Sequence, residues 1–259
     1  MEYRGYIYQQ PHHIGSAVFS LSDTASACIF IYSGMYYKNI TVEFEGPLIL
    51  YKYTEDVMIY KYNTVTIAFN ITSPVAGTLD LSSVVNVRSG NPSMYNIDIK
   101  NTIGEGAQAV ALTVDGDRQS YYGCGFYGYQ NILSRTVDYI FGKAAAWFEQ
   151  CRIISNGGGA ITANNRATDT DTSWYIFNNS TSNIVCRDTA VMGYNLTGNV
   201  YLGQPWDIKT RVIIFEEYEN SEAVSSTVDH LYKTVATAAV TKGQLWPSGS
   251  HWINSAYLA

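Results

Sequence analysis

The run Tyr121-Tyr122-Gly123-Cys124-Gly125-Phe126 decides the fold of this chain, because runs of the same kind recur along the sequence at nearly constant spacing. The others are Tyr95-Asn96-Ile97-Asp98-Ile99, Trp147-Phe148-Glu149-Gln150-Cys151-Arg152-Ile153 and Trp174-Tyr175-Ile176-Phe177. Their first residues follow one another at intervals of 26, 26 and 27 positions. A fixed period in this range indicates a solenoid, in which each structural unit stacks on the next.

The repeating units read as strands. From about residue 27, short runs rich in Val, Ile, Tyr and Phe alternate with turns rich in Gly, Asn, Ser and Thr. Amphipathic helical patterns are scarce. Because no helices separate the strands, we predict an all-β fold, a single-stranded parallel β-helix whose coils bury their inward side chains in one continuous core. The alternative is another all-β fold, which also places strands at regular intervals.

The chain is predicted to be one domain over residues 1–259, since no linker-like segment divides it. Residues 1–20 and those after about 218 fit the repeat poorly. We expect these two ends to cap the solenoid or to be irregular.

The amino-acid composition and net charge restrict the kinds of molecule that the protein is predicted to bind. Of 259 residues, 46% are hydrophobic, which is enough for a substantial core. The formal net charge is −6 and the sequence has no run of Lys and Arg, so nothing predicts a nucleic acid or anionic lipid as partner. No apolar stretch approaches the ~20 residues that span a bilayer. The first residues lack the pattern of a signal peptide.

The four cysteines, Cys28, Cys124, Cys151 and Cys186, contain no C-x-x-C pair, so no zinc site is predicted. Cys124 and Cys151 lie in aromatic strand-like runs, which favours buried free thiols over a disulfide. Triplets of the N-glycosylation type begin at Asn39, Asn70, Asn178, Asn179 and Asn195. They are compatible with secretion, although a chain rich in Asn, Ser and Thr also produces such triplets by chance.

Four segments, taken together and in order, resemble the pectin methylesterases, the pectinesterases of carbohydrate esterase family eight, and look closest to the fungal branch. They are Gly106-Ala107-Gln108-Ala109-Val110-Ala111-Leu112, Gly128-Tyr129-Gln130-Asn131-Ile132-Leu133, Val137-Asp138-Tyr139-Ile140-Phe141-Gly142 and Leu202-Gly203-Gln204-Pro205-Trp206. The likeness runs from about residue 18 to about residue 217. It implies a right-handed parallel β-helix of the pectin-lyase-like kind with a catalytic groove on one face, in agreement with the repeat.

The resemblance assigns roles to single residues. Asp138 matches the nucleophile that attacks the methyl-ester carbonyl of a galacturonate unit. Gln108 and Gln130 match the amides that hold the oxyanion of the tetrahedral intermediate. Trp206 matches an aromatic wall for a sugar ring, and Tyr139 is expected beside the substrate. The family uses neither a metal nor an organic cofactor, so we expect none.

Two positions depart from the family pattern. Asn131 occupies the place of the aspartate that acts as acid and base, and an amide has no proton that it can usefully give to a departing methoxide. General acid–base help is typically worth ~10²–10⁴-fold in rate. Gln204 occupies the place of an arginine, so it supplies neither the charge nor the forked contact that would hold the nucleophile ionised and oriented.

The spacing of two matched positions is also short. Asn131 and Asp138 are only 7 positions apart, whereas in the family they lie on successive coils, and one coil takes on the order of 20 residues or more. We therefore expect that one coil has been shortened between Leu133 and Val137. Gln130 and Asn131 would share a coil with Asp138, and the groove would lack one rung.

Other hydrolytic schemes fit less well. The chain has no Gly-x-Ser-x-Gly motif, and its four histidines (His12, His13, His230, His251) lie outside the repeat, which argues against a Ser–His esterase. It has no Asp-Asp dipeptide of the kind that polygalacturonases use. The acidic pair Asp169 and Asp171 reads as a solvated turn rather than the calcium site of a pectate lyase.

The sequence therefore predicts a pectinesterase-family protein that hydrolyses methyl esters of homogalacturonan to methanol and pectate, with activity impaired by the two replacements. The alternative is a non-catalytic pectin-binding homologue or an aberrant gene product. The family implies a pectin polysaccharide as partner, a monomer, and an extracellular location, with no role for nucleic acid or membrane. The sequence does not predict which pattern of methyl esters is preferred or whether attack along the polymer is processive.

Overall fold

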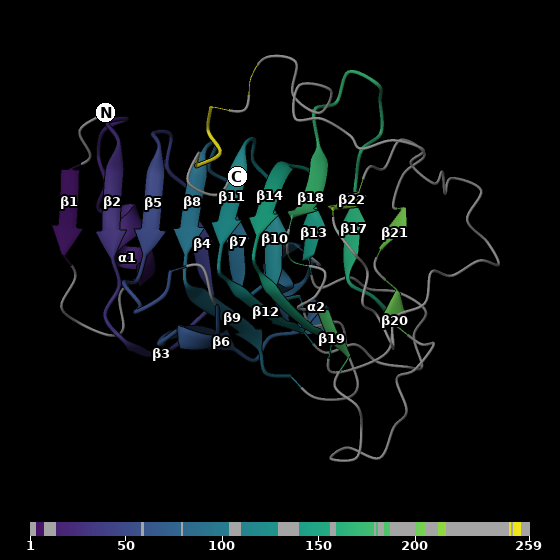
Figure 1. Ribbon diagram of the computed structural model, residues 1–259, viewed down its shortest axis with the longest axis horizontal. Coiled ribbons are helices and arrows are strands. Elements are labelled where there is room, and N and C mark those ends of the chain that lie inside the picture. Colours follow the sequence, from purple (N-terminus) through teal and green to yellow (C-terminus); the bar gives the residue numbers. More distant parts are fainter. Residues whose placement is uncertain are drawn as a thin grey trace.

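The computed structural model describes residues 4–7, 14–57, 60–78, 80–103, 110–128, 140–155, 159–178, 180, 184–186, 200–201, 203–205, 212–215, 249 and 251–254. Most of these residues form parallel strands that stack into a solenoid (Figure 1). In this part of the chain the strands belong to three large sheets, which are named A, B and C below.

Sheet A runs along the length of the molecule. Figure 1 shows its strands side by side, from the N-terminal end at the left to the later coils at the right. Their order is β1 (Arg4–Ile7), β2 (Ala27–Phe30), β5 (Leu48–Tyr51), β8 (Pro92–Tyr95), β11 (Gln119–Tyr122), β14 (Ala145–Glu149), β18 (Trp174–Asn178) and β22 (Val212–Phe215).

Sheets B and C supply the other sides of each coil. Sheet B has the order β3 (Gly34–Tyr37), β6 (Val65–Phe69), β9 (Ile97–Asn101), β12 (Gly125–Gly128), β15 (Arg152–Ser155) and β19 (Ile184–Cys186). Sheet C has the order β4 (Ile40–Val42), β7 (Val85–Val87), β10 (Leu112–Val114), β13 (Ile140–Gly142), β17 (Thr162–Asn164) and β21 (Gln204–Pro205). A short pair, β16 (Gly159–Ala160) and β20 (Val200–Tyr201), lies outside them.

Each described strand pairs in parallel with the equivalent strand of the next coil, as in β8 with β11 and β11 with β14. The prediction of a right-handed parallel β-helix is confirmed. Parallel strands need a connection that returns the chain to the same edge. Here the return is made by the other two sheets of the same coil instead of by a helix.

The strand register differs slightly from the spacing of the runs. Tyr95 pairs with Tyr122, and Tyr122 pairs with Glu149, so the step is 27 positions at both places, whereas the runs begin 26 positions apart. Trp147 pairs with Ile176, a step of 29 positions where the runs begin 27 apart. A residue that begins an aromatic run need not occupy the same strand position in each coil. Since side chains alternate across a strand, a slip of one residue would turn every inward side chain outward.

The correct register builds an aromatic column inside the solenoid. Tyr121 pairs with Phe148, and Phe148 pairs with Phe177. The rings of Tyr121 and Phe148 lie nearly parallel with centroids 4.9 Å apart, and those of Phe148 and Phe177 do so at 4.5 Å. All three side chains are almost fully buried. Each coil thus adds one ring to a continuous core.

The corner between sheets A and B repeats from coil to coil. Asn96, Gly123 and Gln150 occupy it in successive coils, with φ angles of 56°, 57° and 50°. This left-handed conformation is costly for most residues and mild for Gly and Asn. Asn96 is fully buried, and its side-chain amide donates to the carbonyl oxygen of Val57 at 3.0 Å. The corner explains why each repeated run in the sequence crosses from one sheet into the next.

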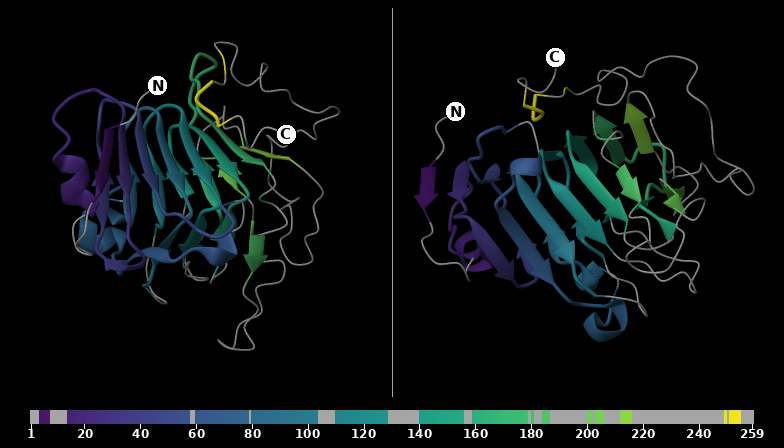
Figure 2. Two further views of the ribbon diagram at one scale, coloured as in Figure 1. Left: turned by 60° about the vertical axis from the view of Figure 1, so that its left-hand side comes forward. Right: turned by 60° about the horizontal axis from the view of Figure 1, so that its bottom comes forward.

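Helical turns and the chain end cover parts of the solenoid. Helix α1 (Ile14–Phe19) lies at the N-terminal end of the solenoid and buries Ile14, Ala17 and Val18 (Figure 2). The remaining turns are η1 (Tyr60–Tyr62), α2 (Ser73–Ala76) and η2 (Asp80–Ser82). Near the other terminus, the backbone N–H of Asn254 donates to the Tyr122 hydroxyl at 2.7 Å, which fixes residues 251–254 to the outer face of sheet A.

Cys124 and Cys151 are fully buried free thiols, as predicted. Cys28 is free and half-buried. None of the helices in the described ranges has both the length and the apolar composition that crossing a bilayer requires.

Candidate active site

Most of the predicted site residues lie in the sequence within or just before strands of sheet C. Six of the seven, Gln108, Gln130, Asn131, Asp138, Tyr139 and Trp206, lie outside the described residues. The seventh, Gln204, begins strand β21. The described strands fix the places at which the undescribed segments end: β10 follows the segment of Gln108, and β13 follows the segment of Asp138.

Strand β13 pairs directly with strand β10. Leu112 lies in register with Ile140, and Val114 with Gly142. No other strand can lie between two strands that share a ladder of hydrogen bonds. Leu112 and Ile140 therefore lie one coil apart. Residues 129–139, which carry Gln130, Asn131 and Asp138, fall between β12 and β13 in the sequence and lie outside the described residues.

That coil has ordinary length. Leu112 and Ile140 are 28 positions apart, close to the 27 that separate Val85 from Leu112. The shortest coil of the described stack takes 21 positions, from Ala27 to Leu48. The separation of Asn131 and Asp138 in the sequence, 7 positions, is smaller than each of these coil lengths.

The outer face of sheet C carries one row of residues in register. The row consists of Thr41, Asn86, Thr113, Phe141 and Ala163, one from each strand, and the position of Gln204 continues it. Their strand neighbours, such as Val85, Val87, Leu112 and Val114, belong to the inner core. Because side chains alternate across a strand, the row faces away from that core. The position of Gln204 is thus aligned with Phe141, three residues after Asp138.

Asn86 and Thr113 were missed as candidates in the sequence. Both are buried, with side-chain exposures of 3% and 0%. A polar residue between two apolar β-strand residues, as in Val85-Asn86-Val87 and Leu112-Thr113-Val114, is the signal that could have identified them. They place polar atoms on the same face as Phe141.

Gly142 fixes the end of the strand that follows Asp138. Its φ of 127° lies in the region that favours glycine, and a Cβ atom there would overlap the carbonyl oxygen of Val114. The Tyr175 hydroxyl donates to the Gly142 carbonyl oxygen at 2.7 Å. The glycine of the Val-Asp-Tyr-Ile-Phe-Gly motif is therefore required for close stacking of β13 on β10.

Beyond Gly142, an ion pair closes the turn that follows β17. The Lys143 ammonium lies 3.0 Å from a carboxylate oxygen of Asp171, and the backbone N–H of Ser173 donates to the other oxygen at 2.9 Å. Burial acts to raise the pKa of Asp171, but these contacts outweigh it and the pKa is lowered. Arg166, only 1% exposed, donates to the carbonyl oxygens of Asp169 and Asp171 at 2.9 and 2.8 Å.

These contacts place Asp169 and Asp171 in a turn, which the buried Arg166 holds by hydrogen bonds to main-chain carbonyl oxygens. The prediction that the turn is solvated holds for Asp169 and is wrong for Asp171, whose side chain is only 6% exposed. In the described ranges, no three acidic, histidine or cysteine side chains gather closely enough to bind a metal ion. The chemistry that the sequence assigns to this face is that of a carboxylate, amides and aromatic rings on a rigid sheet.

The family model described as Pectinesterase matches residues 9–233. The chain belongs to the pectinesterase family. Among curated relatives, "Probable pectinesterase A" from Aspergillus niger is 42% identical over 287 alignment positions, which cover 94% of this chain and 85% of the relative. This likeness supports hydrolysis of pectin methyl esters as the activity of the family.

Solved pectinesterase structures agree with the architecture. The pectin methylesterase from Aspergillus niger, in its deglycosylated form, is 40% identical with a TM-score of 0.73, over 94% of this chain and 93% of that one. A pectin methylesterase in complex with a hexasaccharide is 20% identical, with a TM-score of 0.56 over 80% of this chain and 71% of that one. The second likeness concerns the fold alone.

Proposed function

We propose that this pectinesterase is an aspartyl esterase acting on methylated homogalacturonan outside the cell, with much less activity than an intact family member. The observation that supports the proposal is the direct pairing of β10 with β13, because Asn131 and Asp138 both fall between these two strands in the sequence. The fold and the family of the chain support the proposed substrate class.

In the proposed reaction, a carboxylate oxygen of Asp138 attacks the ester carbonyl carbon. The amides of Gln108 and Gln130 donate to the oxyanion of the tetrahedral intermediate. Collapse of that intermediate breaks the bond to methoxide and leaves an anhydride between Asp138 and the galacturonate. Water then hydrolyses the anhydride and restores Asp138.

We expect departure of methoxide to be the slow step, because the leaving group needs a proton near neutral pH. Asn131 cannot supply that proton, so solvent water has to donate it. Solvent water also has to act as the base when the anhydride is hydrolysed. Gln204 adds a second loss, since a neutral amide does not favour the ionised form of Asp138 as an arginine would. Together these changes predict a rate loss of at least ~10²-fold.

The comparison with the Aspergillus niger relative supports the loss of a segment from this chain. Its alignment has 287 positions, whereas this chain has 259 residues in total. At least 28 alignment positions (287 less 259) therefore stand opposite gaps in this chain. A gap between Leu133 and Val137 would account for the closeness of Asn131 and Asp138 in the sequence.

A methanol-release assay on highly methylated pectin tests the proposal, with the Aspergillus niger pectin methylesterase as reference. We expect a turnover at least ~10²-fold below the reference and a further loss to background in Asp138→Asn. Turnover equal to the reference would overturn the impairment. Residual turnover that survives in Asp138→Asn would overturn the role of Asp138.

Binding distinguishes the remaining alternative, a non-catalytic pectin-binding homologue. Titration with partly demethylated pectin should quench tryptophan fluorescence, and Trp206→Phe should remove most of that change. Binding without any methanol release would favour the non-catalytic homologue. If the protein neither binds pectin nor releases methanol, both functions are contradicted.

A further inference from the structure

The five glycosylation-type triplets of the sequence differ in what the fold allows. Three begin at described residues, Asn39, Asn70 and Asn178. Asn39 and Asn70 are exposed, whereas Asn178 lies half-buried in strand β18 of sheet A. These differences decide which asparagines of the folded protein can carry a glycan.

Asn39 lies just before strand β4, the last strand of sheet C at its N-terminal end. Burial alternates along this segment: Asn39, Thr41 and Glu43 are exposed, while Ile40 and Val42 are buried. The asparagine and the threonine of the triplet thus point to the same, solvent-facing side. A glycan there would displace no core side chain.

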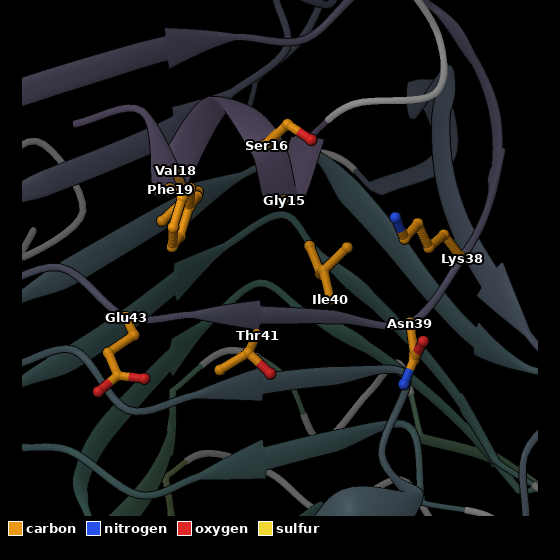
Figure 3. A pocket seen from close by; sticks show the side chains of 9 residues that line it. All are labelled: Gly15, Ser16, Val18, Phe19, Lys38, Asn39, Ile40, Thr41 and Glu43. Carbon is orange, nitrogen blue, oxygen red and sulfur yellow. The ribbon is translucent and has the colours of Figure 1, made fainter.

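Space adjoins the acceptor. A depression of about 330 Å³ lies between helix α1 and strand β4, lined by Gly15, Ser16, Val18, Phe19, Lys38, Asn39, Ile40, Thr41 and Glu43. Figure 3 shows Asn39 and Lys38 at one end of it, Phe19 and Glu43 at the other, and the Asn39 side chain directed away from α1. A bulky sugar on Asn39 therefore meets open surface.

Asn178 is a natural contrast. Its side-chain amide nitrogen, the atom that a glycan would modify, donates to Glu149 Oε2 at 2.8 Å. The hydroxyl of its triplet belongs to Ser180, which is fully buried and donates to the carbonyl oxygen of Phe148 at 3.1 Å. A sugar on Asn178 would break the contact with a carboxylate that is itself only 2% exposed.

We propose that Asn39 is an N-glycosylation site of the folded protein and that Asn178 stays unmodified. The donor is a lipid-pyrophosphate-linked oligosaccharide. The Asn39 Nδ2 forms a bond to the anomeric carbon of its first N-acetylglucosamine, the bond from that carbon to the pyrophosphate oxygen breaks, and lipid pyrophosphate leaves. The proton from Nδ2 passes to a base of the transferase.

Helix α1 faces strand β4 on the side opposite its partner β7, and the Asn39 side chain points away from that helix (Figure 3). The outward row of sheet C runs from Thr41 to Phe141, so a sugar on Asn39 lies at the N-terminal end of this row.

The test expresses the full chain with a secretion leader in yeast, trims the glycans with endoglycosidase H, and maps peptides by mass spectrometry. Material retained inside the secretory pathway is mapped in the same way as secreted material. We expect an N-acetylglucosamine stub on the peptide of Asn39 and an unmodified peptide of Asn178. An unmodified Asn39 peptide, or a stub on Asn178 in folded protein, would overturn the assignment.

Two substitutions of Thr41 form a matched pair. Thr41→Ser keeps the triplet and should keep the stub on Asn39, whereas Thr41→Ala destroys it and should remove the stub. The proposal depends on the proposed secretion and not on ester hydrolysis, so glycan mapping and methanol release can fail independently.

Discussion

Leu112 and Ile140 are direct neighbours in sheet C, although 28 positions separate them in the chain. The step from Leu112 to Ile140 is therefore one turn of the solenoid. In the sequence, the candidate nucleophile Asp138 and the position of the family acid, Asn131, both fall within this step. In a parallel β-helix, two side chains meet across a groove when they occupy equivalent places on neighbouring rungs.

This geometry predicts that Asn131→Asp alone does not restore methanol release. A new carboxylate at position 131 would lie on the coil of Asp138 instead of on the next rung. Turnover of the variant should stay within a few-fold of the unmodified chain. Full recovery by this one change would mean that the two carboxylates already face each other.

A chain that carries an additional coil should respond differently. The variant carries Asn131→Asp together with an insertion between Leu133 and Val137, taken from the corresponding segment of the Aspergillus niger relative. We expect turnover to rise by ~10²-fold or more, because the acid then has its own rung. The insertion with Asn131 retained is the matched control and should stay slow. Equal turnover of the two insertion variants would contradict the role assigned to position 131.

The aromatic column predicts a large stability effect at its centre. Phe148 stacks between Tyr121 and Phe177 and is fully buried. Phe148→Ala should lower the free energy of unfolding by about 3–5 kcal/mol, because it opens a cavity between two rings. Phe19→Ala is the control, since Phe19 is 90% exposed, and it should change that free energy by about 0.5 kcal/mol or less. Urea denaturation measures both.

Gly142 predicts a backbone effect next to the candidate nucleophile. Gly142→Ala should destabilise the protein by about 1–3 kcal/mol or more, because the new Cβ requires a strained φ and overlaps Val114. Gly90→Ala is the matched control, since a Cβ there meets no atom within 4 Å. Similar melting temperatures for the two variants would show that β13 can move away from β10.

The Lys143–Asp171 ion pair predicts a pH dependence of stability. The pKa of Asp171 is lowered in the folded protein, so its ionised form stabilises the fold above the unfolded-state pKa of about 3.9. That contribution is lost as pH falls through the lower folded-state pKa. Asp171→Asn should therefore be less stable than the parent near pH 7, and the difference should shrink as pH falls below about 4. Asp169→Asn, whose parent side chain is 70% exposed, should show little difference at any pH.

Periodicity in the sequence was enough to predict the parallel β-helix, because each coil repeats one pattern of aromatic and β-branched residues. The sequence also predicted buried thiols at Cys124 and Cys151 and the motifs that indicate the family. It could not fix the register, since Tyr121 and Tyr122 are chemically equivalent as the start of a run. Only pairing with Met94 and Tyr95 shows which of them faces the core.

The sequence by itself determined the family, the solenoid and the presence of an amide at position 131, because these depend on residue identity and spacing. The tertiary structure decided which strands are neighbours. It set the pairing of β10 with β13 and the outward row that begins at Thr41. It also left Asn39 exposed and Asn178 half-buried. All of these features depend on residues that lie far apart in the chain. Such contacts are set by how each coil packs on the next, and no local pattern encodes that choice.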